Sequence, residues 1–171
     1  DAILSELFSN EGVGVMVYSD AYRSIRPAVR EDVDEIQLLI HRAVEEEQLI
    51  ERTRSEILDS IEDYIVLEID RNVVGCVAVH HFPEERKAEL ACLFVKRGHT
   101  DQGYGKLLME AAIERSRELN ADSLFALSTQ AAKFLTKGGF EVSEDLSNLP
   151  DPRRQKWQEN GRNAVLLIRQ I

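Results

Sequence analysis

Two closely spaced glycines lie in a polar segment between an apolar run and an amphipathic run. The apolar run ends at Val95, and apolar residues recur at helical spacing from Leu107 onward. Backbone N–H groups at the start of a helix, together with the helix dipole, bind anions. Gly103 and Gly105 would let a phosphate approach the backbone where a Cβ would collide. The spacing therefore predicts a phosphate cradle.

Positive charge near these glycines comes from Lys106, and Arg97 or His99 could add to it. A strand-to-helix turn in which the glycines serve packing explains a bare Gly-x-Gly equally well. Two other phosphate-binding patterns are excluded. Leu107 stands where a P-loop has Ser or Thr, and Leu108 stands where a dinucleotide fingerprint needs its third glycine.

One carboxylate, Glu89, lies within the otherwise apolar stretch Ala88–Val95. Burying a carboxylate costs free energy, so a functional task is expected for it. The alternation in Lys87-Ala88-Glu89 is also compatible with an edge strand whose carboxylate faces solvent. Both interpretations are open at this point.

Metal binding and thiol catalysis are not supported by the cysteines and histidines. Cys76 and Cys92 each lie in an apolar run, without the spacing of a metal site, and are expected as buried free thiols. The 4 histidines also lack metal-ligand spacing. No histidine is placed to activate Cys92, so we assign no metal and no cysteine nucleophile.

These residues must be positioned by one α/β domain, as 171 residues is the size of a single compact domain. Hydrophobic spacing predicts a central mixed sheet flanked by helices. The expected strands are Ile25–Val29, Tyr64–Ile69, Val73–His81, Ala88–Val95, Ser123–Leu127, Phe140–Val142 and Val165–Arg169. The expected helices are 33–43, Ser55–Ile61, a long one from Leu107 to Leu119, and Ala131–Lys137, with a polar excursion before the last strand. The opening segment, Asp1–Tyr22, is less regular.

Composition excludes several function classes. With 21 basic and 31 acidic residues, the net charge is 21 − 31 = −10, which disfavours nonspecific nucleic-acid binding and docking on anionic membranes. No apolar run approaches the roughly 20 residues that span a bilayer, and no secretory leader pattern is present. A cytoplasmic location is expected from these features and from the unpaired cysteines.

Two segments resemble the GCN5-related N-acetyltransferase (GNAT) family. Thr100-Asp101-Gln102-Gly103-Tyr104-Gly105 is similar to the family's [Q/R]-x-x-G-x-[G/A] loop, which binds the pyrophosphate of acetyl-CoA, although Thr100 departs from Gln or Arg. Ala132–Phe140 resembles the family's A-x-x-F-Y-x-x-x-G-F, with Leu135 in place of the tyrosine often used as general acid. The resemblance implies the GNAT fold, with a mostly antiparallel mixed sheet. It also implies acetyl-CoA binding at Leu93, Phe94, Val95, Gln102, Gly103, Gly105 and Lys106.

A narrower resemblance, to the acetyltransferase domains of bacterial N-acetylglutamate synthases, covers nearly the whole chain. It rests on Glu11–Gly14, Tyr22–Ala28, Arg52–Glu56, Gly75–Ala78 and, above all, Ala88-Glu89-Leu90-Ala91-Cys92-Leu93. It implies direct acetyl transfer from acetyl-CoA to L-glutamate, the first step of arginine biosynthesis. Glu89 would then be the general base, and Ser128 would protonate the leaving thiolate.

The same resemblance implies that Arg52, Ile50, Cys92 and Arg162 contact the substrate. Backbone N–H groups near Cys92 and Leu93 would stabilise the oxyanion. Ala164 replaces a serine common in the family. Ser128 is also compatible with a helix cap. Arg54, Arg153 and Arg154 are interpreted as solvated surface charges.

The resemblance further implies that residues 1–22 are the trailing segment of an amino-acid-kinase-like domain and that 23–171 form the acetyltransferase domain. Whether the protein forms a homo-oligomer stays open. Two alternative functions also stay open: a GNAT enzyme acting on another amine, and a catalytically silent acyl-CoA-binding module.

Overall fold

A seven-stranded mixed sheet forms the centre of the chain in this computed structural model, which describes residues 4–5, 17–18, 22–160 and 164–171. The strand order is β3-β4-β5-β6-β7-β9-β8, and the pairing is antiparallel except between β6 and β7. The strands are β3 (Arg23–Pro27), β4 (Tyr64–Ile69), β5 (Asn72–Phe82), β6 (Lys87–Val95), β7 (Ser123–Ser128), β8 (Glu141–Ser143) and β9 (Val165–Gln170). Two further short strands, β1 (Leu4–Ser5) and β2 (Val17–Tyr18), pair with each other.

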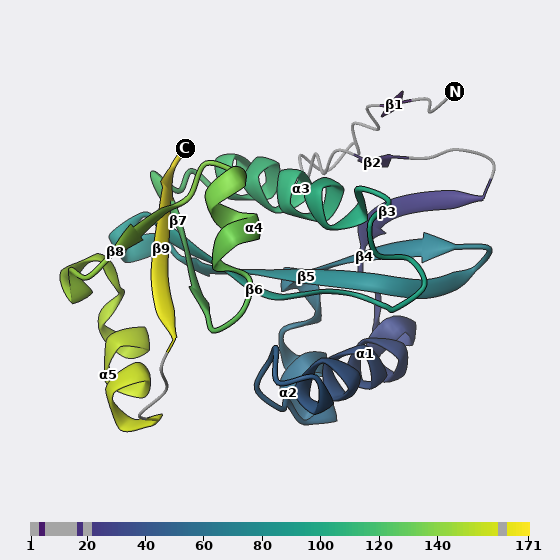
Figure 1. The fold of residues 1–171 in the computed structure, drawn as a ribbon, viewed down its shortest axis with the longest axis horizontal. Helices are drawn as coiled ribbons and strands as arrows, with labels where there is room; N and C mark the ends of the chain where they lie inside the picture. Colours follow the sequence, from purple (N-terminus) through teal and green to yellow (C-terminus); the bar gives the residue numbers. More distant parts are fainter. Residues whose placement is uncertain (1–3, 6–16, 19–21, 161–163) are drawn as a thin grey trace.

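Helices cover both faces of the sheet (Figure 1). On one face lie α3 (Tyr104–Glu118) and α4 (Ala132–Lys137), and on the other lie α1 (Val33–Glu45), α2 (Arg54–Asp59) and α5 (Asp151–Asn160). Single 3-10 turns are η1 (Arg30–Asp32), η2 (Ile61–Asp63), η3 (Pro83–Glu85) and η4 (Leu146–Asn148).

Period-two alternation along the strands separates the core into layers. Ile65 and Leu67 of β4 pack with the apolar side of α3, whereas Tyr64 and Val66 pack with α1 and α2. The core under α5 is smaller and is built on Phe125 and its neighbours. Glu89 alternates with Ala88 and Leu90, which face α3, so its side chain lies on the face that carries α1, α2 and α5.

Two irregularities of β6 create space in the sheet. The parallel ladder with β7 runs only from Lys87 to Glu89, so the two strands separate beyond Glu89. On the other side, Cys92 and Leu93 lie opposite the single residue Val77 of β5, which is a β-bulge. Cys92 adopts the left-handed backbone conformation there, with φ +54°. The bulge removes these two residues from the regular ladder.

Most expected elements are confirmed within a few residues, and one helix was missed. A turn at Asp70 and Arg71 joins β4 to β5, with positive φ at both residues. No regular element was predicted for the polar excursion before β9, but it contains α5. Most of the segment 1–22 lies outside the described residues.

Candidate active site

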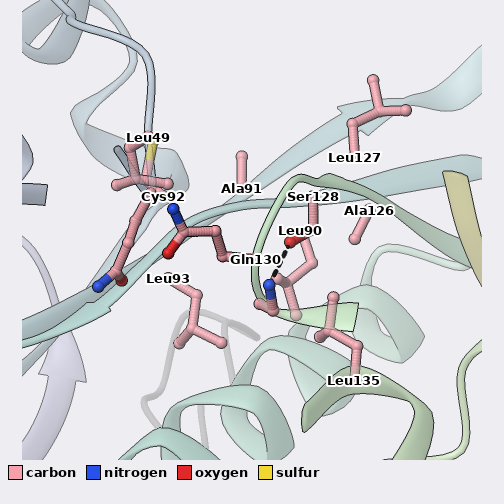
Figure 2. A pocket seen from close by; sticks show the side chains of 12 residues that line it. Leu49, Leu90, Ala91, Cys92, Leu93, Ala126, Leu127, Ser128, Gln130 and Leu135 are labelled. Carbon is pink, nitrogen blue, oxygen red and sulfur yellow. Dashed lines mark hydrogen bonds between the residues drawn. The ribbon is translucent and has the colours of Figure 1, made fainter. Parts of the chain in front are cut away.

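A cavity of ≈ 230 Å³ opens where β6 and β7 separate. Its walls come from β6, from β7 with the loop that follows it, from α4 and from the loop after α1 (Figure 2). The lining residues are Gln48, Leu49, Leu90, Ala91, Cys92, Leu93, Ala126, Leu127, Ser128, Gln130, Ala131 and Leu135. Most of the lining residues are apolar, with the bulge of β6 on one side and Ser128 on the other. Such a site suits a thin, mostly apolar chain with a few polar groups.

Glu89, at the last paired position before the strands separate, is buried, with 4% of its surface exposed. The edge-strand interpretation is therefore wrong, because β6 is central in the sheet. Its two carboxylate oxygens lie 3.1 and 3.0 Å from Nε of Arg153 on α5. The guanidinium of Arg153 therefore fixes the orientation of the Glu89 carboxylate.

The interpretation of Arg153 as a solvated surface charge is therefore wrong. Its side chain is only 15% exposed and holds the candidate base. Arg154 is also more than a surface charge, since its guanidinium donates to the carbonyl oxygens of Leu146 and Leu149. Arg54 does lie at the surface, where it pairs with Asp34 at 2.8 Å.

Arg52 approaches the same region from the segment between α1 and α2. Burial on its own would lower the pKa of Arg52, but the acidic groups of Cys92 and Tyr64 raise it above the ordinary value. Glu89 acts in the same direction, which places Arg52 within the electrostatic reach of the candidate base. The side chain is therefore a partly buried, permanent cation.

The bulge at Cys92 is fixed by buried contacts from neighbouring strands. The Cys76 thiol donates to the carbonyl oxygen of Cys92 at 3.3 Å, and the Tyr64 hydroxyl lies 3.8 Å from the Cys92 sulfur. Burial raises the pKa of the Cys92 thiol despite the nearby Arg52. Cys92 is thus a neutral thiol, and its contribution to the site is the shape of the backbone.

Ser128 lies at the end of β7 on the wall of the cavity (Figure 2). Its hydroxyl oxygen accepts a hydrogen bond from the Ala131 backbone N–H at 2.7 Å, which organises the turn into α4. This arrangement is compatible with Ser128 as a cap and with Ser128 as a proton donor. The hydroxyl oxygen caps the turn, while the hydroxyl hydrogen can still donate into the cavity.

The loop between β6 and α3 presents the expected backbone cradle. Gly103 is the N-cap of α3 with φ +80°, and a Cβ there would meet nothing within 4 Å. The first N–H groups of a helix have no partner within the helix and can bind an anion. Lys106 is exposed and only loosely paired with Glu110 at 4.0 Å, whereas Arg97 pairs with Glu46 at 2.9 Å. The cradle can hold a phosphate group.

Of the other residues predicted to bind acetyl-CoA or substrate, only some lie at the cavity. Leu93 lines the cavity, while Phe94 is buried against the α1 side and Val95 packs on the α3 side. Gln102 is exposed and donates to the Gly98 carbonyl at 3.4 Å. Ile50 is 43% exposed, next to Arg52. Arg162 lies outside the described residues.

Among the residues that the structure describes, no group of three or more histidine, cysteine or acidic side chains could hold a metal ion. In the same part of the chain, no helix is long and apolar enough to cross a membrane.

The comparison with known families agrees with this geometry. The model of the acetyltransferase (GNAT) family matches residues 30–140, which run from η1 to the residue before β8 and include β6 and the loop that leads into α3. The chain belongs to the GNAT family. The mixed, mostly antiparallel sheet flanked by helices is accordingly the GNAT acyltransferase fold.

Several relatives resemble this GNAT chain over nearly its full length. An amino-acid acetyltransferase of Neisseria meningitidis serogroup A is 35% identical over 99% of the chain, and one of Actinobacillus pleuropneumoniae serotype 3 is 30% identical over 98%. A crystal structure of N-acetylglutamate synthase from Neisseria gonorrhoeae, complexed with coenzyme A and N-acetyl-glutamate, superposes with a TM-score of 0.83 and 35% identity over 90% of the chain. The chain spans 39%, 38% and 36% of the lengths of these three proteins.

Sequence reasoning missed three parts of this GNAT site. Arg153 was overlooked because it reaches Glu89 from a helix 64 residues away in the sequence. Gln48 and Gln130 line the cavity from loops that carry no motif. Gln130 donates to the Glu47 carbonyl at 3.2 Å, and so joins the loop after β7 to the loop after α1.

Proposed function

We propose that the chain transfers the acetyl group of acetyl-CoA to the α-amine of L-glutamate, giving N-acetylglutamate and CoA. The observation that carries this proposal is the buried Glu89 carboxylate at the point where β6 and β7 separate, beside the cavity and within reach of Arg52. The gonococcal structure with coenzyme A and N-acetyl-glutamate supports the choice of both substrates.

Acetyl-CoA binding is supported by the residues that would contact it. The open left-handed position at Gly103 and the free N–H groups at the start of α3 suit the pyrophosphate. The cavity between β6 and β7 suits the thioester end, because Leu90, Leu93 and Leu135 make its walls largely apolar. The two sites are joined by the end of β6 and the loop that follows.

Glutamate binding is supported by the cations around Glu89. Planar guanidinium groups bind carboxylates through paired hydrogen bonds. Arg52 supplies one such group, and Arg162 is proposed as a second on the basis of the family resemblance. The exposed Ile50 would contribute its backbone next to Arg52, and Cys92 would contribute its backbone from the bulge.

In the proposed reaction Glu89 takes a proton from the α-ammonium group of glutamate, since a protonated amine cannot attack. The freed amine nitrogen bonds to the thioester carbonyl carbon, whose oxygen becomes negative. Backbone N–H groups at Cys92 and Leu93, released from the ladder by the bulge, would stabilise that charge. The C–S bond then breaks, and Ser128 donates a proton to the departing thiolate. The second proton that the nitrogen loses as it becomes an amide replaces the one that Ser128 gave. The Ala131 N–H that binds the Ser128 oxygen makes this hydroxyl a better donor.

The segment before residue 23 is proposed to continue from an amino-acid-kinase-like domain. The curated relatives are more than twice as long as this chain, which supports further sequence outside the acetyltransferase domain.

The direct test is CoA release from acetyl-CoA, with L-glutamate compared against other amino acids and polyamines. We expect glutamate-dependent turnover that falls about 10²- to 10⁴-fold in Glu89→Gln, while binding of acetyl-CoA persists. Glu141→Gln is the matched control, because Glu141 is exposed on the edge strand β8. Turnover with another amine in place of glutamate would contradict glutamate as the substrate. Binding of acetyl-CoA without any turnover would contradict the proposed acetyltransferase activity.

A further inference from the structure

The histidine opposite Glu89 carries a buried nitrogen atom for which the described residues provide no hydrogen-bond partner. Among the described side chains, His80 Nε2 is buried without a hydrogen bond. The other ring nitrogen, Nδ1, lies 2.9 Å from a carboxylate oxygen of Asp63 in η2. Buried polar atoms are usually satisfied, so an exception calls for a role.

The contact with Asp63 determines which nitrogen of His80 carries the proton. An ionised carboxylate only accepts hydrogen bonds, so Nδ1 must donate to it. In the neutral ring the lone pair then lies on Nε2. The unpartnered atom is therefore a proton acceptor held ready within the protein.

His80 lies beside the candidate base. It is the direct register partner of Glu89 in the antiparallel pair of β5 and β6. Side chains at such positions share one face of the sheet, with Cβ atoms about 4.5–5.5 Å apart. The Tyr64 ring meets the imidazole edge-on at 6.4 Å between centroids and limits its rotation. Burial raises the pKa of Tyr64, so this phenol stays neutral and does not compete for the proton.

Exposure increases along this row of side chains. The side chain of Glu89 is 6% exposed, that of His80 18% and that of Asp63 36%. A buried base that gains a proton in each turnover must pass it on before the next. Asp63 contacts His80, Arg153 contacts Glu89, and Arg52 is within electrostatic reach of Glu89. Neither arginine can accept a proton.

We propose that His80 and Asp63 form the path by which the proton leaves Glu89. The O–H bond of the protonated Glu89 breaks and an N–H bond forms at His80 Nε2, directly or through one water. Nδ1–H is hydrogen-bonded to the carboxylate of Asp63, which is partly exposed. The imidazolium gives this proton through Asp63 to solvent water, and proton exchange with solvent then returns the remaining ring proton to Nδ1. This inference rests on the proposed function of Glu89 as base.

The test compares His80→Gln with His81→Gln in glutamate-dependent turnover at low buffer concentration. Gln keeps polarity at position 80 but cannot accept a proton. We expect kcat to fall roughly tenfold or more in His80→Gln, with KM for acetyl-CoA unchanged, and added imidazole buffer to restore much of it. His81 pairs with Ala88 and takes no part in the path, so His81→Gln should match the wild type.

Asp63→Asn is the second variant, and it serves if His80→Gln does not fold. It leaves the imidazole of His80 in place but removes the carboxylate beside it. It should lower kcat in the same direction, again with recovery on adding buffer. Wild-type turnover in both variants, or a loss that buffer does not restore, would overturn the proton path. If Glu89→Gln loses turnover while these variants do not, only the path is wrong. If Glu89→Gln keeps full turnover, the proposed function itself fails.

Discussion

Arg153 Nε lies 3.0 and 3.1 Å from the two carboxylate oxygens of Glu89, so α5 holds the side chain proposed as the base. In the described part of the chain, the terminal nitrogens of this guanidinium form no hydrogen bond to protein. One end of Arg153 thus orients Glu89, and its terminal nitrogens remain available as hydrogen-bond donors.

Replacing Arg153 with Gln should impair both turnover and stability. A buried carboxylate without its partner costs about 3–5 kcal/mol, and the orientation of Glu89 is lost with it. We expect turnover to fall by about tenfold or more, with partial recovery in Arg153→Lys, which keeps the charge but not the planar donor. CoA release and thermal unfolding measure the two effects. Arg54→Gln is the control, because Arg54 is exposed, and an equal loss there would contradict a specific role for Arg153.

Cys92 should be dispensable as a nucleophile. Burial raises the pKa of its thiol, so the reactive thiolate is absent at neutral pH. We expect Cys92→Ala to keep turnover within about tenfold of the wild type, since the bulge at residue 92 and not its sulfur serves the reaction. Rapid-quench measurements should detect no acetyl-enzyme in either protein. A burst of acetyl-enzyme in the wild type that disappears in the variant would contradict direct transfer.

Gly103→Ala should weaken the binding of acetyl-CoA. Ala at φ +80° has open space for its Cβ but suffers backbone strain of about 1–2 kcal/mol. Relief of that strain would turn the first N–H groups of α3 away from the ligand. We expect Kd, measured by calorimetry, to rise about tenfold.

Gly98→Ala is the matched control for the cradle. Gly98 also has positive φ, at +92°, and open space around it, but it does not cap α3. The two variants should lose similar stability, while only Gly103→Ala loses affinity. Equal losses of affinity would contradict a cradle at the start of α3.

Asp32 should make stability depend on pH in the acidic range. Burial would raise the pKa of Asp32, but hydrogen bonds from Arg26 and from the Val29 N–H lower it below its ordinary value of 3.8. A carboxyl with a lowered folded-state pKa contributes stability above its unfolded-state pKa, and that contribution disappears as the pH falls through the folded-state pKa. The free energy of unfolding should therefore decrease below about pH 4.

Asp32→Asn tests this ion pair. We expect it to cost about 1–3 kcal/mol at pH 7 and less at pH 3, measured by urea unfolding. Glu68 still pairs with Arg26 in the variant, which limits the loss. Asp34→Asn, at an exposed side chain, should change stability by less than about 0.5 kcal/mol. A loss for Asp32→Asn that is independent of pH would rule out the lowered pKa.

Local patterns predicted the sheet and the glycine turn at the start of α3 because their signals are local. The alternation in β4 and the apolar spacing of α3 reflect burial on one face, and Gly103 marks a backbone conformation that favours glycine. By contrast, α5 has no apolar stripe, and Trp157 is its only large apolar residue. Pro152 in its first turn was the available signal for a helix start.

Two features of the site depend on tertiary structure. The pairing of Glu89 with Arg153 joins a strand to a helix 64 residues later, which no local pattern encodes. The bulge at Cys92 places a non-glycine residue at positive φ, and that conformation is held by contacts from Cys76 and Tyr64. Such a conformation is rare for cysteine and has no sequence signal.

The most direct measurement is mass-spectrometric detection of N-acetylglutamate after acetyl-CoA and L-glutamate are mixed with the wild-type chain or with Glu89→Gln. We expect the product, acetylated on the α-nitrogen, from the wild type, and at least about a 10²-fold lower rate from the variant. Equal product formation by the two proteins would contradict Glu89 as the base, and no product from the wild type despite acetyl-CoA binding would contradict the acetyl transfer itself.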